Sequence, residues 1–262
     1  MFQRDLVSRA IELTLFSSRL EGEQPSSLLV AAQVEEGKSM RVSHYALMDS
    51  VAYLADATAY GIVKEYLEEL QKGRIAHLII PELIRLLARE DSGALIAFLG
   101  ELMEEGIKEI QTYATSFRLP TPVKAGVIAC IAKGNLSSRM RHWNETGFLS
   151  RFFVVSYSYS QETAERVMDS IIGRETQPTT SLVLPEKQRV HLPENIARGL
   201  SPMAKELAQG LYAPLHGFRM QKHLQRLVMA SALQDGRDTV SKEDFLNVLE
   251  ICKYANLDYK EL

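Results

Sequence analysis

Residues 26–39, SSLLVAAQVEEGKS, constrain the fold more than any other stretch of this chain. Residues 27–32 are a short run of apolar and small residues behind a Pro-Ser break, and a run of this length predicts a buried strand rather than a helix. The run leads through four residues, two of them acidic, into Gly-Lys-Ser at 37–39, after which residues 40–48 can form a helix. The stretch therefore predicts a strand, a loop and a helix in succession.

This succession, with Gly-Lys-Ser before the helix, is the layout of a phosphate-binding P-loop. Backbone N–H groups of such a loop hold a phosphate, the lysine reaches the β/γ-phosphates and the serine hydroxyl ligates magnesium. The full pattern asks for glycine five residues before Gly37, where this chain has Ala32. A plain strand-turn-helix therefore remains an alternative at this point. The prediction assigns nucleotide binding to Val34, Glu35, Glu36, Gly37, Lys38, Ser39 and Met40.

The composition is that of an ordinary globular protein. Of 262 residues, 46% are hydrophobic and 24% charged, with a formal net charge of −3, so the overall charge does not point to nucleic acid. No apolar run approaches the roughly 18 residues of a membrane span, and the first residues lack the apolar block of a signal peptide. Cys130 and Cys252 lie far apart without metal-ligand spacing, which predicts reduced thiols in a cytoplasmic protein.

Apolar runs and helical stretches alternate along the first 160 residues. Buried strands are expected at residues 27–32, 51–55, 75–80, 124–132 and 152–157. Helices are expected at residues 2–19, 40–48, 60–70 and 91–105, and residues 107–117 alternate as a strand or hairpin arm does. This alternation predicts an α/β fold with a mainly parallel sheet.

The pattern changes after Ser160. Helices are expected at residues 161–172, 193–212, 217–234 and 241–254, with a short strand pair within residues 181–192. The last helix opens with a capping box, Ser-Lys-Glu-Asp at 241–244. We therefore expect two domains, an α/β nucleotide-binding core at residues 1–160 and a small, mainly helical lid at residues 161–262.

An acidic residue follows the buried strand expected at residues 75–80, where the sequence continues with Pro81 and Glu82. A nucleotide hydrolase needs a carboxylate at the end of an apolar strand beside the loop strand, to hold magnesium or to polarise the attacking water. Glu82 can supply that carboxylate, although Pro81 takes the place of the usual first acid. The alternative is a helix start with proline at the first position and glutamate at the second, which needs no ligand.

Residues 128–153 form a third informative stretch. A buried strand leads to Asn135 at its exposed end, and a basic, polar loop is expected from there to Gly147. Trp143 within this loop could stack on a base or serve as a partly buried anchor. Leu-Ser-Arg-Phe follows at residues 149–152 and contains Arg151.

The order of these motifs resembles that of AAA+ ATPases, and it is most similar to the mini-chromosome maintenance helicase branch. In that branch a Leu-Ser-Arg-Phe segment carries the arginine finger. Residues 217–227, GFRMQKHLQRL, and residues 236–244, GRDTVSKED, are similar to the branch's sensor-2 helix and to the turn into its last helix. The resemblance covers residues 26–256 and rests on the order and spacing of the motifs.

The resemblance implies an AAA+ core that binds ATP or ADP with Mg²⁺, hydrolyses ATP and assembles into a homo-oligomeric ring. It assigns phosphate binding to Lys38, magnesium binding to Ser39 and Glu82, catalysis to Glu82, Asn135 and Arg151, and a nucleotide contact to Arg219. Arg151 would lie at the subunit interface, and DNA handling in replication or in a mobile element is the expected setting. The alternative is a catalytically inactive scaffold for oligomerisation and partner binding, which Ala32 and Pro81 favour.

Overall fold

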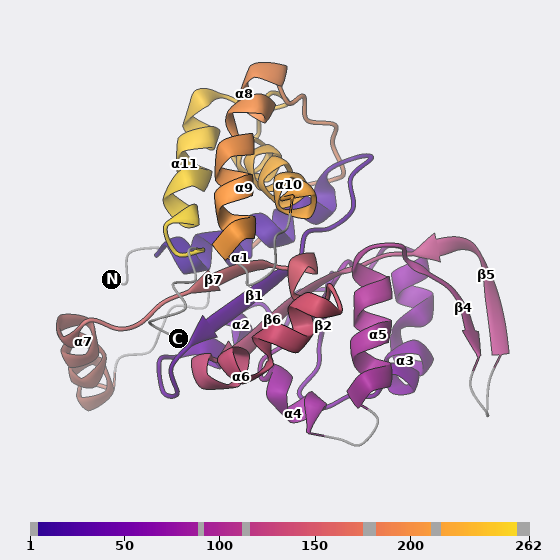
Figure 1. The fold of residues 1–262 in the computed structure, drawn as a ribbon, viewed down its shortest axis with the longest axis horizontal. Helices are drawn as coiled ribbons and strands as arrows, with labels where there is room; N and C mark the ends of the chain where they lie inside the picture. Colours follow the sequence, from indigo (N-terminus) through magenta and orange to yellow (C-terminus); the bar gives the residue numbers. More distant parts are fainter. Residues whose placement is uncertain (1–4, 89–91, 112–115, 175–181, 211–215, 256–262) are drawn as a thin grey trace.

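A parallel sheet forms the centre of the molecule. The computed structural model describes residues 5–88, 92–111, 116–174, 182–210 and 216–255. The sheet has five strands in the order β2-β3-β6-β1-β7, and every neighbouring pair is parallel (Figure 1). The strands are β1 (Leu28–Ala32), β2 (Val51–Tyr53), β3 (His77–Ile80), β6 (Gly126–Ala132) and β7 (Phe153–Ser156). The expected α/β class with a parallel sheet is thereby confirmed.

Helices cover both faces of the sheet, which explains why its strands are continuous apolar runs. Side chains of β1 alternate between two hydrophobic clusters: Leu28 and Val30 belong to one, Leu29 and Ala31 to the other. The first cluster includes side chains of α1 (Leu6–Phe16), α9 (Ser201–Gly210), α10 (Phe218–Gln234) and α11 (Lys242–Cys252). The second includes side chains of α3 (Ala59–Gln71), α4 (Leu83–Leu87), α5 (Ser92–Met103) and α6 (Lys133–Glu145).

The chain path places a topological switch at β1. From β1 the chain passes through α2 (Lys38–Ser43) to the edge strand β2 and then returns through β3 and β6 to a place beside β1. It next crosses to the other side of β1, where it forms β7. In open parallel sheets of this kind, ligands bind in the crevice outside the carboxyl ends of the strands, where the connections diverge.

Several expected boundaries are wrong. The acid-bearing strand β3 does not lie beside β1, because β6 is inserted between them. Residues 133–145 form helix α6 rather than a loop, so Asn135 lies in the first turn of that helix. The described residues 182–192 contain isolated bridges, Leu20 with Gln188 and His191 with Thr239, in place of a strand pair. The helix expected at residues 193–212 is divided into α8 (Glu194–Gly199) and α9, and residues 211–212 lie outside the described part.

The strand or hairpin arm expected at residues 107–117 is confirmed in part: β4 (Ile107–Gln111) pairs antiparallel with β5 (Ser116–Val123), and the pair extends away from the sheet (Figure 1). Residues 112–115 lie outside the described part of the chain. The expected capping box of α11 is also present, with Ser241 and Asp244. Both cysteines are free and buried. Within the described residues, no helix is long and apolar enough to cross a membrane.

The C-terminal helices share their core with the N-terminal part of the chain. Ile11 of α1, Leu224 of α10 and Ile251 of α11 are fully buried in the same cluster as one face of β1. Helix α7 (Gln161–Ile172) differs from the others, because none of its residues is buried. It stands apart from the other helices in Figure 1, beyond the carboxyl ends of the strands.

Candidate functional site

The loop at residues 33–37 joins the carboxyl end of β1 to α2, at the switch point of the sheet. Glu35 and Gly37 have φ angles of 69° and 71°, both in the left-handed region, whereas the φ of the intervening residue is not positive. Alternation of this kind turns successive backbone N–H groups toward one concave side that can hold an anion. A Cβ atom at Gly37 would lie 3.0 Å from the hydroxyl oxygen of Tyr159, so the position suits glycine alone.

Glu36 braces this loop instead of projecting into solvent. Its Oε2 accepts a 2.7 Å hydrogen bond from the backbone N–H of Gln33, and its Oε1 accepts one of 2.8 Å from the N–H of Tyr159. The hydroxyl of Tyr157 donates to the backbone carbonyl of Glu36 at 2.7 Å. The carboxylate therefore ties the loop to the segment that follows β7. Val34 and Met40, on either side of the loop's acidic residues, are exposed.

Lys38 is the first residue of α2, and its Nζ donates a hydrogen bond to the backbone carbonyl of Gln33. Partial burial lowers the pKa of Lys38, while nearby negative groups act in the opposite direction. Those groups include Glu36 and Glu82; the thiol of Cys130 is neutral at pH 7, because burial raises its pKa to about 12. The ammonium group of Lys38 is therefore within electrostatic reach of two carboxylates.

Ser39 connects the loop to the strand that carries the acid. Its Oγ donates a 3.0 Å hydrogen bond to the carbonyl oxygen of Pro81, the residue before Glu82. Glu82 is exposed, and it is the N-cap residue of α4 without a side-chain capping bond. The alternative that placed Pro81 and Glu82 at the first two helical positions is therefore wrong. The structure brings the Ser39 hydroxyl and the Glu82 carboxylate into one neighbourhood, although β6 separates their strands.

Asn135 lies at the same edge of the sheet, at the third position of α6 and partly exposed. Because β6 runs between β1 and β3, Asn135 stands between the Gly37–Ser39 segment and Glu82 in the strand order. Its backbone carbonyl accepts a 3.0 Å hydrogen bond from Ser138 Oγ.

Trp143 is 1% exposed and packs edge-on against Phe148 with 5.3 Å between ring centroids, so it is a buried anchor that cannot stack on a base.

Lys133 is a site residue that sequence reasoning missed. It is buried, and its Nζ donates a 2.8 Å hydrogen bond to Ser158 Oγ. Lys133 follows the last residue of β6, Ser158 follows β7, and β1 runs between these two strands. The lysine side chain therefore crosses the carboxyl end of β1, where the loop begins. No carboxylate among the described residues forms an ion pair with it. The signal was a lysine directly after a buried strand.

Arg41 is a second residue that sequence reasoning missed, and it contacts the loop indirectly, through Tyr157. Its guanidinium lies 4.9 Å from the ring centroid of Tyr157, and its Nε donates to the hydroxyl of that residue at 3.2 Å. The same guanidinium forms an ion pair with Asp5, ahead of α1. Arg41 therefore makes its contacts within the fold, and the hydroxyl of Tyr157 that it contacts donates in turn to the backbone carbonyl of Glu36.

The two remaining predicted arginines lie at the opposite end of the strands, near their amino ends. Arg151 ends the short helix η2 (Leu149–Arg151), and its guanidinium donates a 2.7 Å hydrogen bond to the carbonyl of Gly147. Arg219, at the start of α10, pairs with Glu104 at 2.7 Å and donates to Ser150 Oγ at 2.9 Å. Glu104 also lies 4.0 Å from Arg151. The structure therefore brings the two arginines together around one carboxylate.

The arginine pair is far from the loop of its own chain. The first residue of β7, Phe153, pairs with the first residue of β1, Leu28, so Arg151 precedes the amino ends of these strands. The loop begins only after the fifth residue of β1. At about 3.3 Å per residue, the strand alone separates the two places by roughly 16 Å.

His223 links the helical layer to Arg151. It is buried in α10, one turn after Arg219, and its ring is hydrogen-bonded to the backbone of Arg151. Burial, together with the charges of Arg226 and Arg219, lowers the pKa of His223 to about 3, so the ring is neutral at pH 7. A neutral buried ring holds the η2 turn, and sequence periodicity gives no sign of such a contact.

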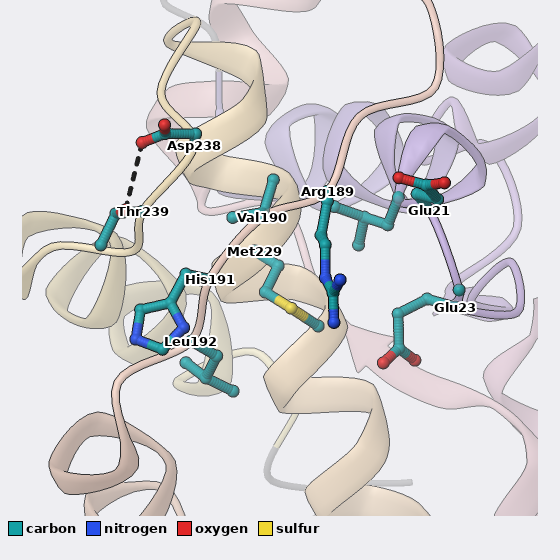
Figure 2. Close-up of a pocket in the computed structure, with 11 residues that line it drawn as sticks. Glu21, Glu23, Arg189, Val190, His191, Leu192, Met229, Asp238 and Thr239 are labelled. Atoms are coloured by element: carbon teal, nitrogen blue, oxygen red, sulfur yellow. Dashed lines mark hydrogen bonds between the residues drawn. The ribbon is translucent and has the colours of Figure 1, made fainter.

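A separate pocket of about 620 Å³ lies where residues 188–192 fasten the segment before β1 to the C-terminal helices. Figure 2 shows Arg189 on the same side of this pocket as Glu21 and Glu23, with His191 on the other side. Glu23 already pairs with Arg226 at 3.1 Å. None of the residues predicted from the sequence lines this pocket. Because residues 20–23 precede β1, the pocket is distinct from the loop at its carboxyl end.

No protein-family model matches the chain, and a search of curated proteins finds no match. The resemblance to AAA+ ATPases therefore rests on the residues and their order along the chain. Within the described residues, no group of three or more His, Cys, Asp or Glu side chains is arranged to hold a metal ion by itself.

Proposed function

We propose that this chain is an AAA+-type protein that binds ATP or ADP with Mg²⁺ at residues 33–39 and hydrolyses ATP as an oligomer. The observation that carries the proposal is the hydrogen bond from Ser39 to the carbonyl of Pro81. This bond joins the start of α2 to the residue before Glu82, and Glu82 is within electrostatic reach of Lys38, which supports a shared site beyond the carboxyl ends of the strands. Ligands of parallel α/β sheets bind in that crevice.

The phosphates would contact two lysines and the backbone of the loop. Lys38 would exchange the carbonyl of Gln33 for a phosphate oxygen, which gains a charge-assisted hydrogen bond. Lys133, held over the end of β1, would supply a second positive charge. The left-handed residues Glu35 and Gly37 support a concave row of N–H donors toward the same anion.

The residues at this edge fit magnesium. Mg²⁺ prefers oxygen ligands, keeps several of its waters and is usually bound by one or two protein groups together with substrate phosphates. Ser39 Oγ and the carboxylate of Glu82 are two oxygen donors of this kind, and Glu82 makes no side-chain capping bond within α4. When bound, the ion neutralises charge that develops on the phosphates. Glu82 would ligate the ion through a water or orient the attacking water, while Asn135 would contact the terminal phosphate.

The arginine pair would act on a neighbouring copy. An arginine finger supplied in trans stabilises the charge of the phosphoryl-transfer transition state. Arg151 and Arg219 lie together at the amino edge, so both would belong to the face that meets the loop of the next subunit. A homo-oligomeric ring with Arg151 at the interface is therefore part of the proposal.

A second candidate function is a scaffold that keeps the fold without catalysis. The closure of the loop on itself favours it, because Glu36 satisfies two backbone N–H groups and Lys38 bonds to Gln33 without any ligand. The position of Pro81 in place of a first acid favours it as well. Magnesium-dependent release of phosphate from ATP separates the two candidates, since the scaffold releases none.

Ser39→Ala tests the proposed site, with Ser43→Ala as the matched control. Ser43 is exposed near the end of the same helix, where its hydroxyl bonds only to the backbone of Met40 among the described residues. Each protein is titrated with ATP and with ADP, with and without magnesium. We expect the parent and the control to bind ATP more tightly with magnesium, and Ser39→Ala to lose that gain. Equal magnesium dependence in all three proteins would contradict the site.

DNA as a partner is a proposal that rests on the resemblance alone, because the chain has a net charge of −3. Fluorescence anisotropy with single-stranded and double-stranded oligonucleotides, in the presence of ATP and over a series of salt concentrations, tests it. Contacts with phosphates would give an affinity that falls steeply as salt rises. Absence of any anisotropy change at low salt would remove DNA from the proposal.

A further inference from the structure

Helix α7 carries an apolar stripe that is largely exposed. Val167, Met168, Ile171 and Ile172 recur at helical spacing along one side of the helix. Met168 is 57% exposed, Ile171 65% and Ile172 73%, and no residue of α7 is buried. A contiguous exposed stripe of this kind marks an interaction surface.

The rest of α7 is acidic. Glu162, Glu165 and Asp169 supply three negative charges, and Arg166 supplies one positive charge that pairs with Glu162 at 3.5 Å. The helix therefore carries two net negative charges. Helices that lie on membranes are rich in lysine and arginine, because the lipid surface is anionic. The charge of α7 instead favours a protein surface that combines apolar side chains with basic ones.

Such a surface exists at the start of α10. A pocket of about 360 Å³ there is lined on its apolar side by Ala208, Phe218 and Met220. Phe218 is 74% exposed and stacks on His216 with 5.4 Å between ring centroids. Among its charged side chains, Arg219 pairs with Glu104 of the same lining at 2.7 Å, and Lys222 is exposed and forms no ion pair with a described residue. We call this surface the α10 groove.

The α7 stripe lies near the carboxyl ends of the strands and the α10 groove near their amino ends, so the two surfaces cannot meet within one chain. Ser160 caps α7 directly after Tyr159, whose N–H bonds to Glu36 of the loop, and α7 therefore starts beside the loop. The α10 groove includes Arg219 and Ser150, which belong to the arginine pair at the amino edge. Figure 1 shows α7 at one end of the molecule, apart from α10.

We infer that α7 of one copy docks its apolar stripe into the α10 groove of a second copy, head to tail. The acidic flank of α7 would face Lys222, and the contact would carry Arg151 and Arg219 of the second copy toward the loop of the first. A heterologous contact of this type builds rings when its rotation closes and filaments when it does not. The inference rests on the proposed function only where it gives Arg151 and Arg219 a role at the loop of the neighbouring copy. The docking itself involves no nucleotide.

Cross-linking of two proteins, each with one added surface cysteine, tests the contact. One protein carries Met168→Cys and the other Phe218→Cys, and both positions are exposed, whereas Cys130 and Cys252 are buried and do not compete. A short bis-maleimide is added to each protein alone and to the mixture. We expect a covalent dimer in the mixture and several-fold less in either protein alone. Leu47→Cys, at a position 92% exposed, replaces Phe218→Cys in a control mixture that should give little dimer.

The outcomes separate the possible occupants of the stripe. A dimer of Met168→Cys alone would mean that two α7 helices pair with each other, and it would overturn the inference. No dimer in any mixture would overturn it too, as would co-sedimentation of the monomer with phosphatidylcholine vesicles. Ile171→Glu, on the exposed stripe, should reduce the mixed dimer several-fold without a change in melting temperature. The same cross-link should form when both proteins also carry Lys38→Ala, because the contact involves no nucleotide. Failure of the docking inference is thereby distinguished from failure of ATP binding.

Discussion

Lys133 Nζ reaches Ser158 Oγ at 2.8 Å across the carboxyl end of β1, so a buried ammonium group lies where the loop of residues 33–37 begins. The lysine is held by one hydroxyl and forms no ion pair with a carboxylate in the described part of the chain. It complements Lys38, whose ammonium group is within electrostatic reach of Glu36 and Glu82.

Lys133→Met should weaken ATP binding while the fold is retained. Methionine fills nearly the same space, and the loss of one charge-assisted contact corresponds to roughly a tenfold loss of affinity. Lys72→Met is the matched control, because Lys72 is exposed at the end of α3 and pairs there with Glu68. Calorimetric titration with ATP measures both variants. An unchanged affinity of Lys133→Met would remove Lys133 from the phosphate site.

Glu36→Gln should destabilise the protein. The amide keeps one oxygen that can accept, so one of the two backbone N–H groups held by the carboxylate loses its partner, and a lost hydrogen bond to a charged group typically costs about 1.5–3 kcal/mol, less at this partly exposed site. Glu35→Gln serves as the control, since Glu35 is exposed and makes no side-chain hydrogen bond to the described residues. Chemical denaturation compares the two proteins. Equal free energies of unfolding would show that Glu36 does not brace the loop.

Glu82→Gln should abolish turnover and leave ATP affinity close to that of the parent. One carboxylate at the end of β3 must serve the magnesium shell or the attacking water, and the amide can do neither well. Stability should hardly change, because Glu82 makes no capping bond. Magnesium-dependent phosphate release is measured for both proteins side by side. Equal rates above background would exclude a catalytic role, and no release from the parent would favour the scaffold.

Arg151→Ala should keep ATP binding and lose turnover. A mixture with Lys38→Ala should regain some activity, because the intact arginine of one protein can then face the intact loop of the other. Arg141→Ala is the control, at an exposed arginine of α6 that pairs with Glu145. If the mixture stays as inactive as its components while the parent is active, Arg151 does not act across an interface.

Stability should fall as the solution is acidified below pH 6.5, in part because of two buried histidines. Burial lowers the pKa of His223 to about 3 and that of His77 to about 4, so the unfolded chain takes up protons that the folded chain does not. Unfolding is therefore favoured as pH decreases from 6.5 toward these values, by about 1.4 kcal/mol per pH unit for each histidine at most. His223→Gln should flatten the pH dependence of the melting temperature, whereas the exposed His142→Gln should not.

Sequence patterns predicted the sheet well, because both of its faces are covered. Each central strand is a continuous apolar run, such as Gly126–Ala132, and this signal is local. The insertion of β6 between β1 and β3 is a non-local pairing, which no pattern along the chain encodes. One missed helix was readable: Leu136, Met140 and Trp143 recur at helical spacing, and all three are buried in α6.

The candidate site was predicted only in part, for a similar reason. Lys38 and Ser39 stand in a local motif, so their place at a helix start could be anticipated. The hydrogen bond from the Tyr159 N–H to Glu36 joins residues that are far apart in the sequence, so no local pattern predicts it. The assembly of Arg151, Arg219 and Glu104 at the opposite edge likewise depends on tertiary packing.

The central claim is that ATP binds through Lys38, and calorimetric titration of Lys38→Ala tests it most directly. Lys64→Ala provides the control, at an exposed lysine of α3. We predict that the parent and Lys64→Ala bind ATP alike in the presence of magnesium, and that Lys38→Ala binds it roughly tenfold more weakly or not at all. Equal affinity of all three proteins, or no binding by the parent, would contradict the account.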